Sequence, residues 1–296
     1  MGSARLADTR RALREVPCPT LAIAADLASP AASAWVGHFD VVVAEPAELV
    51  PILATIRRTP LAAMALVQLL RHSAELDAHQ GLVAESFVYS TLQAGPEFAA
   101  WLKHRPASVP NKEDSRPAVL VHRDGDRLEL TLNRPHKRNA FSAEMRDRLT
   151  EALRVAVGDP SIAEVVLRGA GEAFSAGGDL DEFGTLADPA TAHAIRSTRN
   201  PARLMSLCGA RTRVEVHGAC VGAGVELPAF ARRVVAARDA YFQLPEVAMG
   251  LVPGAGGTVS IPRRIGRQRT AQLALSAQRL DAETAWRWGL VDELAA

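Results

Sequence analysis

The sequence predicts an α/β fold in which helices pack around sheet, and three observations predict it. Beyond residue 118, apolar runs typical of strands alternate with glycine-rich turns and helical patterns. Before residue 105 the patterns are mainly helical, with apolar faces that need a packing partner. The 296 residues are 48% hydrophobic and 23% charged, which is an ordinary globular composition with enough apolar surface for a substantial core.

The first 58 residues predict a small strand, loop, strand unit between two helical segments. A short amphipathic segment begins the chain, and the apolar runs at 20–27 and 39–46 favour strands. The alanine-rich first run also suits a helix, whereas the second is rich in β-branched residues. Residues 48–58 then have a helical pattern.

Three further helices are expected before residue 105. Thr59-Pro60 is a favourable helix start, with Thr as the N-cap and Pro at the first helical position, and strong helix formers follow over 61–73. Residues 76–94 predict a second helix, which Gly95-Pro96 ends before a short third helix over 96–105. The side chains of the second helix available for burial are Leu82, Phe87, Tyr89 and Leu92.

A linker separates two predicted domains. Residues 105–117 are polar and contain three prolines, which favours a linker or an exposed crossing. We therefore place a boundary near residue 111. It divides the chain into a mainly helical segment over 1–110 and an α/β core over 111–296.

Strand, turn and helix patterns follow one another within the core. Residues 119–135 predict a β-hairpin joined around Asp124-Gly125-Asp126, because apolar and polar residues alternate after the turn. Ser142 caps a helix that ends at Gly158 and Pro160. The remaining expected elements are strands over 163–170, 212–218 and 232–240, helical structure over 190–210, a short helix after residue 179, and helices from about Gly224 and near Asp281.

Charge and cysteine content argue against several classes of function. The formal net charge is +1, so no overall field points to nucleic acid or to an anionic membrane. Cys18, Cys208 and Cys220 are widely spaced and have no histidine at metal-ligand spacing, which suits a reducing compartment and predicts no metal site. No apolar run reaches the length of a membrane span. We therefore expect a soluble cytoplasmic protein.

The stretch from Val216 to Thr258 holds two glycine-rich turns and two glutamates, Glu226 and Glu246, in mostly apolar surroundings. Carboxylates in such surroundings are candidates for acid/base chemistry. A further glycine turn lies at 175–179, and the turns at 175–179 and 221–225 could together supply two N–H donors to one developing oxyanion. The alternative is that each is only a tight turn. Neither dinucleotide nor P-loop patterns are present, which argues against nucleotide cofactors.

Four segments, LTLNRPHKRNAFS, AFSAGGDLDEF, VHGACVGAGVELPAF and FQLPEVAMGLVPGAGGT, occur in an order and spacing that resemble the crotonase (enoyl-CoA hydratase/isomerase) superfamily. The resemblance covers about residues 119–294. It implies a crotonase-like spiral of ββα units, a CoA thioester bound in a bent pose, and an oxyanion hole that stabilises a thioester enolate. Coenzyme A would be part of the substrate, so no separate cofactor is implied, and a homotrimer or hexamer is expected.

Carried over residue by residue, the resemblance assigns the oxyanion donors to the backbone N–H groups of Ala176 and Ala223. It assigns the two hydratase glutamates to Glu226 and Glu246. An enoyl-CoA hydratase uses both carboxylates around one water, whereas many Δ3,Δ2-isomerases need only the one that matches Glu246. The alternative is a structural role, with both glutamates paired to the nearby Arg232, Arg233 or Arg263.

Other positions are implied to contact the substrate. Lys137 and Arg138 lie where the family's CoA adenine and phosphate region begins, although a solvated basic loop is an equal alternative. Asp179 is expected to cap or brace its turn. The turn glycines expected along the substrate are Gly177, Gly178 and Gly222.

The order of the segments departs from the family. Members continue past the equivalent of GLVDEL with a helical segment that closes the CoA site and builds a trimer, whereas here the sequence ends at Ala296. Residues 59–107 resemble that segment, so we expect residues of about 46–108 to supply the closing helices from the N-terminal side. The alternative is an unrelated helical extension. We expect an enoyl-CoA hydratase-like lyase, with an isomerase and a non-catalytic acyl-CoA-binding protein as alternatives.

Overall fold

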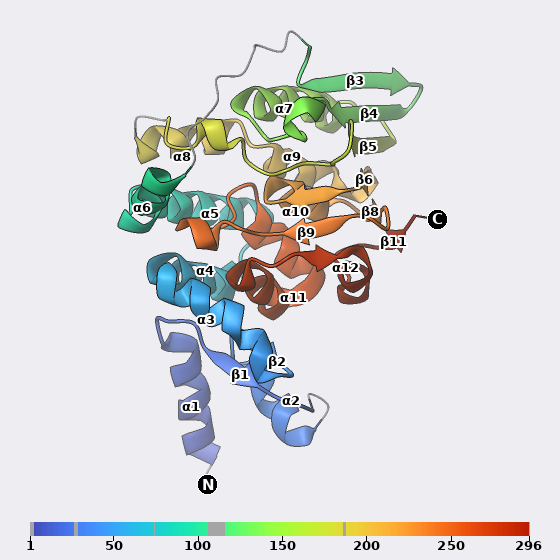
Figure 1. Cartoon of the computed structure of the whole chain (residues 1–296). Helices are drawn as coiled ribbons and strands as arrows, with labels where there is room; N and C mark the ends of the chain where they lie inside the picture. The colour runs from blue at the N-terminus through green and yellow to red at the C-terminus, as the bar shows by residue number, and fades with distance from the viewer. Residues whose placement is uncertain (1–2, 27–28, 74, 106–115, 186–187, 296) are drawn as a thin grey trace.

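A computed structural model describes residues 3–26, 29–73, 75–105, 116–185 and 188–295, and it confirms the α/β fold class. The β3–β5 strands and α7 lie at one end of the molecule, and the first helix lies at the other (Figure 1). A single cluster of buried apolar side chains runs through both the N-terminal segment and the core. The predicted linker and the boundary near residue 111 fall almost wholly outside the described residues.

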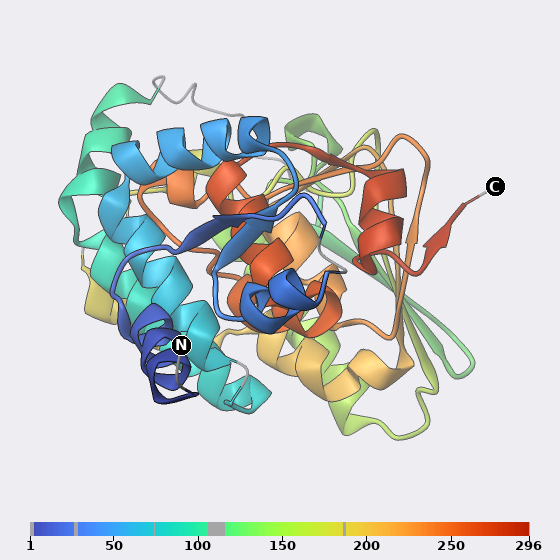
Figure 2. The same cartoon turned by 90° about the horizontal axis from the view of Figure 1, so that it is seen from below.

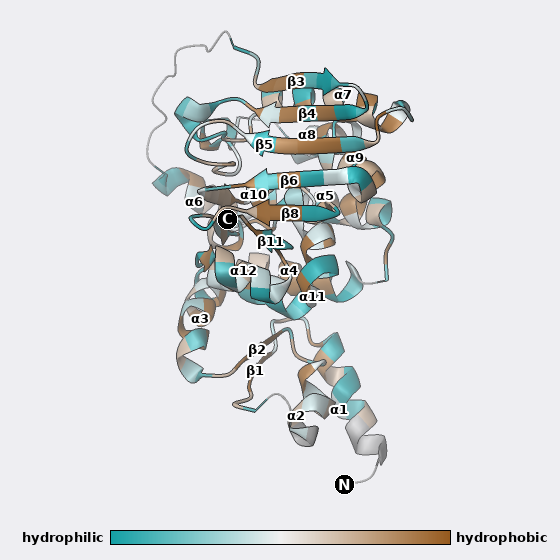
Figure 3. Ribbon diagram, turned by 90° about the vertical axis from the view of Figure 1, so that its right-hand side faces the viewer, coloured by the Kyte–Doolittle hydropathy of each residue, from teal (hydrophilic) through white to brown (hydrophobic). Residues whose placement is uncertain are grey.

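The larger sheet has six strands in the order β11-β8-β6-β5-β4-β3. The hairpin of β3 and β4 is antiparallel and turns at Gly125, as the sequence predicts, and the other neighbours are parallel. Figure 3 shows the strands side by side, with hydrophobic runs on β4, β5 and β8. Their bounds are β3 Val119–Asp124, β4 Arg127–Leu132, β5 Glu164–Gly169, β6 Thr212–Val216, β8 Arg233–Ala236 and β11 Glu293–Leu294.

A second sheet of three short strands brings the glycine turns together. It consists of β7 (Ala219–Val221), β9 (Tyr241–Gln243) and β10 (Leu280–Asp281), in the order β10-β9-β7. The sequence did not predict β7 or β9, because each has only three residues and lies next to turn residues. Since β7 and β9 are parallel, the turns that follow them begin at the same edge of this sheet.

The helices of the core differ from expectation in several places, and the 20-residue helix α11 (Gly257–Ser276) was not predicted from the sequence. The expected helical run 190–210 is two helices, because Asn200 caps a new helix and Pro201 occupies its first position. The helix expected from Gly224 is a single turn, which continues as a 3₁₀ turn at Pro228–Phe230. The core helices are α7 Ala143–Gly158, α8 Pro189–Thr198, α9 Pro201–Cys208, α10 Ala223–Glu226, α11 Gly257–Ser276 and α12 Ala282–Trp288. The other 3₁₀ turns are η2 Pro135–Lys137, η3 Leu180–Glu182, η4 Gly209–Arg211 and η6 Val247–Met249.

The N-terminal segment contains the expected strand pair and helices. The strands β1 and β2 are parallel, with α2 in the connection between them. Thr59 does not cap the following helix, because its hydroxyl donates back to the Thr55 carbonyl; the N–H groups of Leu61 and Ala62 donate to the Glu97 carboxylate instead. The elements are α1 Ser3–Glu15, β1 Leu21–Ile23, α2 Pro30–Val36, β2 Val41–Val43, η1 Pro46–Glu48, α3 Leu49–Arg58, α4 Pro60–Ser73, α5 Ala78–Gln93 and α6 Pro96–His104.

The N-terminal segment packs on the core through α11. Helices α3, α4 and α5 all contact α11, and Figure 2 shows them around it. Buried Asp40, next to β2, pairs with Arg71 of α4 and Arg267 of α11, at 2.6 and 3.2 Å. Gly81 of α5 permits close contact, since a methyl group there would lie 2.9 Å from the Val259 side chain. The two segments are therefore joined by apolar packing and by a buried ion pair.

Within the described residues, no single helix is long and apolar enough to cross a bilayer. Helices η1–α3 and α4 reach that length only as a pair, which is bent by 111°.

Candidate active site

The turn at 175–179 runs beside β7. The N–H of Ser175 donates to the Ala219 carbonyl, and the N–H of Val221 donates to the Ser175 carbonyl, at 3.0 and 2.9 Å. The N–H of Ala176 donates to the Arg138 carbonyl at 2.9 Å, so it is already engaged and the prediction that it is an oxyanion donor is wrong. The N–H of Gly178, two residues on, has no acceptor among the described residues.

The second turn lies against the first. A methyl group on Gly177 would lie 3.0 Å from the Val221 carbonyl oxygen, so only a glycine permits this approach. Gly222 has φ +50°, and its N–H donates to the Gln243 carbonyl at 2.9 Å. Helix α10 begins immediately afterwards, and the N–H of Ala223 has no acceptor in the described part of the chain.

Glu226 lies at the end of α10 with only 2% of its surface exposed. Its Oε2 accepts hydrogen bonds from the N–H groups of Ala255 and Gly257, at 2.7 and 2.8 Å. These donors belong to the glycine-rich loop before α11, by which we mean residues 254–258, whose last two residues form the start of the helix. The first-turn N–H groups there lack partners within the helix. The loop therefore fixes the position of the Glu226 carboxylate.

Glu246 approaches the same turn from the other side. It follows β9, and its Oε1 lies so near Gly222 that a methyl group on that glycine would be 2.5 Å from it. Its Oε2 is buried and has no hydrogen-bond partner in the described structure. A buried carboxylate oxygen without a partner is costly, and it is the kind of group that a bound substrate or water satisfies.

Burial shifts the ionisation of both glutamates. Burial raises the pKa of Glu246 to about 8, and the charge of Glu85 adds to the rise. Burial also raises the pKa of Glu226 well above its ordinary value, and the charges of Glu246 and Glu85 raise it further. The hydrogen bonds from Ala255 and Gly257 act in the opposite direction, because they favour the ionised carboxylate. The two groups titrate as an interacting pair, and the pair retains a proton at neutral pH.

Among the described residues, neither Glu226 nor Glu246 forms an ion pair with an arginine. In the described structure, Arg233 pairs with Glu293, while Arg263 donates to the carbonyls of Val259 and Leu76. The alternative in which nearby arginines neutralise Glu226 and Glu246 is therefore wrong. Among the described residues there is also no group of three or more His, Cys, Asp or Glu side chains that could hold a metal ion.

Lys137, Arg138 and Asp179 support the first turn. Buried Asp179 pairs with Arg134 at 2.8 Å and accepts the N–H of Asp181, so it braces the turn. Lys137 pairs with Asp179 at 3.6 Å and also with Asp181, and its side chain is only 19% exposed, so it is not part of a solvated loop. Arg138 has φ +50° and is exposed, and it offers its carbonyl to Ala176.

Helix α5 of the N-terminal segment contributes residues that the sequence did not single out. Glu85 is 2% exposed and accepts hydrogen bonds from Gly256 and Thr258 in the loop before α11. The Tyr89 ring lies against Gly254 of the same loop and 4.5 Å below the Arg196 guanidinium. A glutamate on the expected buried face of this helix was the only signal available. Phe87, which we expected to be buried there, is 56% exposed.

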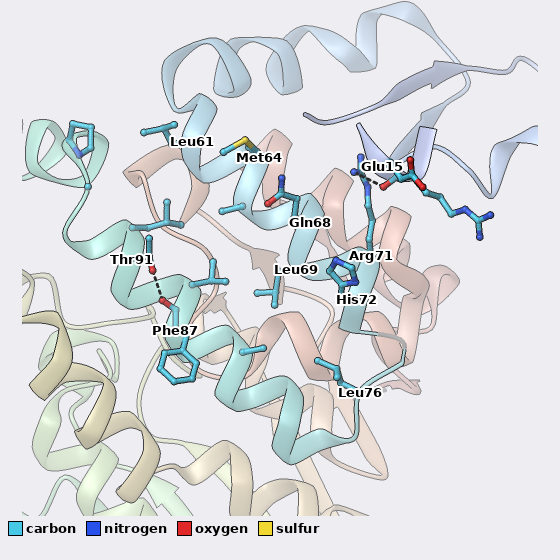
Figure 4. A pocket seen from close by; sticks show the side chains of 17 residues that line it. Glu15, Leu61, Met64, Gln68, Leu69, Arg71, His72, Leu76, Phe87 and Thr91 are labelled. Carbon is cyan, nitrogen blue, oxygen red and sulfur yellow. Dashed lines mark hydrogen bonds between the residues drawn. The ribbon is translucent and has the colours of Figure 1, made fainter. Parts of the chain in front are cut away.

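A separate pocket lies on the other side of α5. It has a volume of about 980 Å³ and is lined by α1, α4 and α5, with Leu61, Met64, Leu69 and Phe87 on its walls and Arg71 and His72 near one end (Figure 4). Glu226, Glu246 and the two glycine turns do not line it. The pocket is therefore distinct from the glutamate site.

The family of the chain follows from its similarity to known proteins. Residues 127–296 match the family model described as enoyl-CoA hydratase/isomerase. The chain belongs to this family. As an enoyl-CoA hydratase/isomerase, it is an enzyme of the crotonase type that acts on acyl-CoA thioesters.

Individual relatives include both kinds of enzyme in the family's name. The chain is 36% identical over 178 residues to the 2,3-dehydroadipyl-CoA hydratase of Escherichia coli, covering 60% of this chain and 68% of the relative. It is also 36% identical over 177 residues to the 1,2-epoxyphenylacetyl-CoA isomerase of the same organism, covering 58% and 68%.

Solved structures give the same result for the fold. A crystal structure of enoyl-CoA hydratase from Mycobacterium smegmatis matches with a TM-score of 0.56 and 32% identity, covering 61% of this chain and 71% of that one. A structure of an enoyl-CoA hydratase/isomerase from Mycobacterium paratuberculosis matches with a TM-score of 0.56 and 33% identity, covering 62% and 74%.

Proposed function

We propose that this enzyme adds water across the α,β double bond of an enoyl-CoA thioester. The observation that carries the proposal is the convergence of two carboxylates on one turn: Glu246, half-buried with a buried Oε2, lies against Gly222, and buried Glu226 lies at the end of the helix that begins at Ala223. A hydration needs a base for the water and an acid for the α-carbon, and two interacting carboxyl groups can supply both.

The thioester carbonyl is assigned to the N–H groups of Gly178 and Ala223. Both lack acceptors among the described residues, and their turns are in contact through Gly177 and Val221. Two donors aimed at this oxygen withdraw charge from the β-carbon, which makes it electrophilic, and they stabilise the enolate that forms after attack. Loss of one such donor typically lowers kcat about 10²- to 10³-fold.

The two glutamates take different parts in the proposed reaction. Glu226 carries the charge, because two loop N–H groups donate to its carboxylate, whereas Oε2 of Glu246 accepts no hydrogen bond. The water oxygen bonds to the β-carbon as its proton passes to Glu226, and Glu246 gives its proton to the α-carbon. The double bond becomes a single bond, and return of the proton from Glu226 to Glu246 through solvent restores the starting state.

The remaining features of the proposal come from the family resemblance. CoA enters as part of the substrate and no separate cofactor is used, with the exposed side chain of Arg138 available to the CoA phosphates. The N-terminal helices close the site in place of the family's C-terminal ones, which is supported by the contacts of α5 with the loop before α11. A homotrimer or hexamer in the cytoplasm is expected, without nucleic-acid or membrane partners, and light scattering coupled to size-exclusion chromatography tests the assembly.

A Δ3,Δ2-enoyl-CoA isomerase is the second candidate. Of the two glutamates, Glu246 is the one with a buried oxygen that has no partner in the described structure, and an isomerase needs one carboxylate. Steady-state assays with crotonyl-CoA and 3-hexenoyl-CoA, each with Glu226→Gln and Glu246→Gln, separate the two. Hydration that both substitutions abolish supports the hydratase. Isomerisation that survives Glu226→Gln, without hydration by the unaltered enzyme, favours the isomerase, and acyl-CoA binding without any turnover favours a binding protein.

A further inference from the structure

The loop before α11 is held between two carboxylates. Four successive N–H groups donate alternately: those of Ala255 and Gly257 to Glu226, at 2.7 and 2.8 Å, and those of Gly256 and Thr258 to Glu85, at 2.7 and 2.9 Å. The segment turns here, with Gly256 at φ +101° and helix α11 beginning at Gly257, and the N–H groups at this helix start are divided between the two carboxylates.

Glu85 belongs to α5, more than 160 residues away along the chain from this loop. Its carboxylate also accepts the Thr258 hydroxyl at 2.6 Å, which gives it three hydrogen bonds in a site where only 2% of the residue is exposed. A buried acid with this many donors has one well-defined position. It therefore limits where the loop can lie, and the loop in turn limits where Glu226 can lie.

We propose that Glu85 is a positioning residue for the reaction, acting through the Ala255–Thr258 loop on the Glu226 carboxylate. This inference rests on the proposed function, because Glu226 must act in catalysis for its position to affect the rate. Glu85 itself does not touch the assigned water or thioester positions. The N-terminal segment thereby becomes part of the catalytic apparatus as well as part of the core.

The charged groups around Glu85 come from several elements. Tyr89 lies on its own helix, Arg196 of α8 lies over the Tyr89 ring, and Glu226 and Glu246 lie beyond the loop. Burial raises the pKa of Glu85 to about 7, while its hydrogen bonds from Thr258 and Gly256 and the charge of Arg196 act in the opposite direction. When Glu85 is ionised, its charge raises the pKa of both Glu226 and Glu246. Removal of the Glu85 charge should therefore lower the apparent pKa of the glutamate pair.

The test replaces Glu85 by Gln, which keeps the size but places an NH₂ group against at least one loop donor. We expect kcat for crotonyl-CoA hydration to fall about 10- to 100-fold, since a displacement of about 1 Å can cost 10²-fold. The dissociation constant of butyryl-CoA, an unreactive substrate analogue, should stay within about 2-fold. The high-pH limb of the kcat/KM profile should move to lower pH.

Glu97→Gln is the matched control, because Glu97 also accepts two backbone N–H groups, but they are those of Leu61 and Ala62 at the start of α4 rather than those of the loop. It should lower Tm while leaving kcat and the pH profile unchanged. Equal kcat losses in Glu85→Gln and Glu97→Gln, or an unaltered kcat in Glu85→Gln, would overturn the positioning role.

Thr258→Val provides a second variant should Glu85→Gln fail to fold. It removes the hydroxyl donor but keeps both backbone donors and the Glu85 charge. We expect a smaller loss of kcat with no shift of the high-pH limb, and an unaltered kcat would argue against the proposal. Glu226→Gln, measured in parallel, separates the two hypotheses: if it retains hydration, the proposed function fails, whatever the Glu85 variants do.

Discussion

Gly222 offers a test in which backbone strain and a steric effect on the site can be separated. Its φ of +50° and ψ of −117° form a backbone conformation that L side chains rarely adopt, so an alanine there costs about 1–3 kcal/mol. A methyl group at this position would also lie 2.5 Å from Oε1 of Glu246, whereas 3.4 Å is the start of ordinary contact. The Glu246 carboxylate would have to move by 3.4 − 2.5, or about 0.9 Å. A displacement of about 1 Å can cost 10²-fold in rate.

Gly125 is the matched control for this substitution. It has φ +58° in the exposed turn of the β3–β4 hairpin, and a methyl group there would meet nothing within 4 Å. Urea unfolding should show that Gly125→Ala loses about 1–2 kcal/mol from strain. Gly222→Ala should lose about 1–3 kcal/mol from strain, and any further loss from the steric contact should occur only there. Hydration of crotonyl-CoA should lose about 100-fold in kcat only in Gly222→Ala. If the two variants had equal kcat values, Glu246 would not be placed as the structure has it, or would not act in the reaction.

Three other predictions concern stability. The free energy of unfolding should fall as pH rises between about 5 and 8, by up to about 1.4 kcal/mol per pH unit, because folded Glu246 keeps a proton that its unfolded form, with a pKa of 4.5, has released. In urea titrations, Glu246→Gln should flatten this dependence of the unfolding free energy on pH. An unchanged dependence would contradict the assignment of the raised pKa to Glu246. Asp40→Asn should lower the free energy of unfolding by about 3–5 kcal/mol, because it leaves the arginine partners of a buried ion pair uncompensated. Asp8→Asn removes an exposed ion pair and should lower it by under about 1 kcal/mol. Similar unfolding curves for these two variants would refute the prediction. Deletion of residues 1–110 should yield aggregated or non-trimeric protein in light scattering, because α11 loses its cover; a stable, active trimer would argue against the closing role of the N-terminal helices.

Local patterns predicted most of the fold because local physics determines those elements. The alternation in the β3–β4 hairpin, the Ser142 cap and the helix start near Asp281 each depend on residues within a few positions, and the structure has each of them. Strands β7 and β9 could not be predicted, since a three-residue strand has too few positions to show a period. The cap of α4 was assigned to Thr59, but the carboxylate that performs this role lies 36 residues away from Leu61.

In the candidate site, too, local sequence indicated some features, whereas others depend on contacts between distant segments. Glycine turns and glutamates in apolar sequence indicated where chemistry could lie, and the family resemblance indicated which residues to compare. The sequence could not show which N–H groups are free, because that depends on acceptors elsewhere: the Arg138 carbonyl takes the Ala176 N–H and leaves Gly178 available. Nor could it show Glu85, because a glutamate within a helix is indistinguishable from a solvated one until the partners of its carboxylate are known.

The Glu85 contact also bears on the order of the segments. A hydrogen bond from Gly256 to Glu85 has the same geometry whether the helix precedes or follows the core in the chain, and the entropic cost of closing a longer loop grows only logarithmically with its length. Packing therefore does not determine whether these helices come before or after the core in the sequence. It requires that they reach α11, where α3, α4 and α5 lie. A relocated closing segment can thus keep its contacts with the site, and Glu85 makes this testable, since its effect on kcat measures whether the N-terminal helices still act on the chemistry.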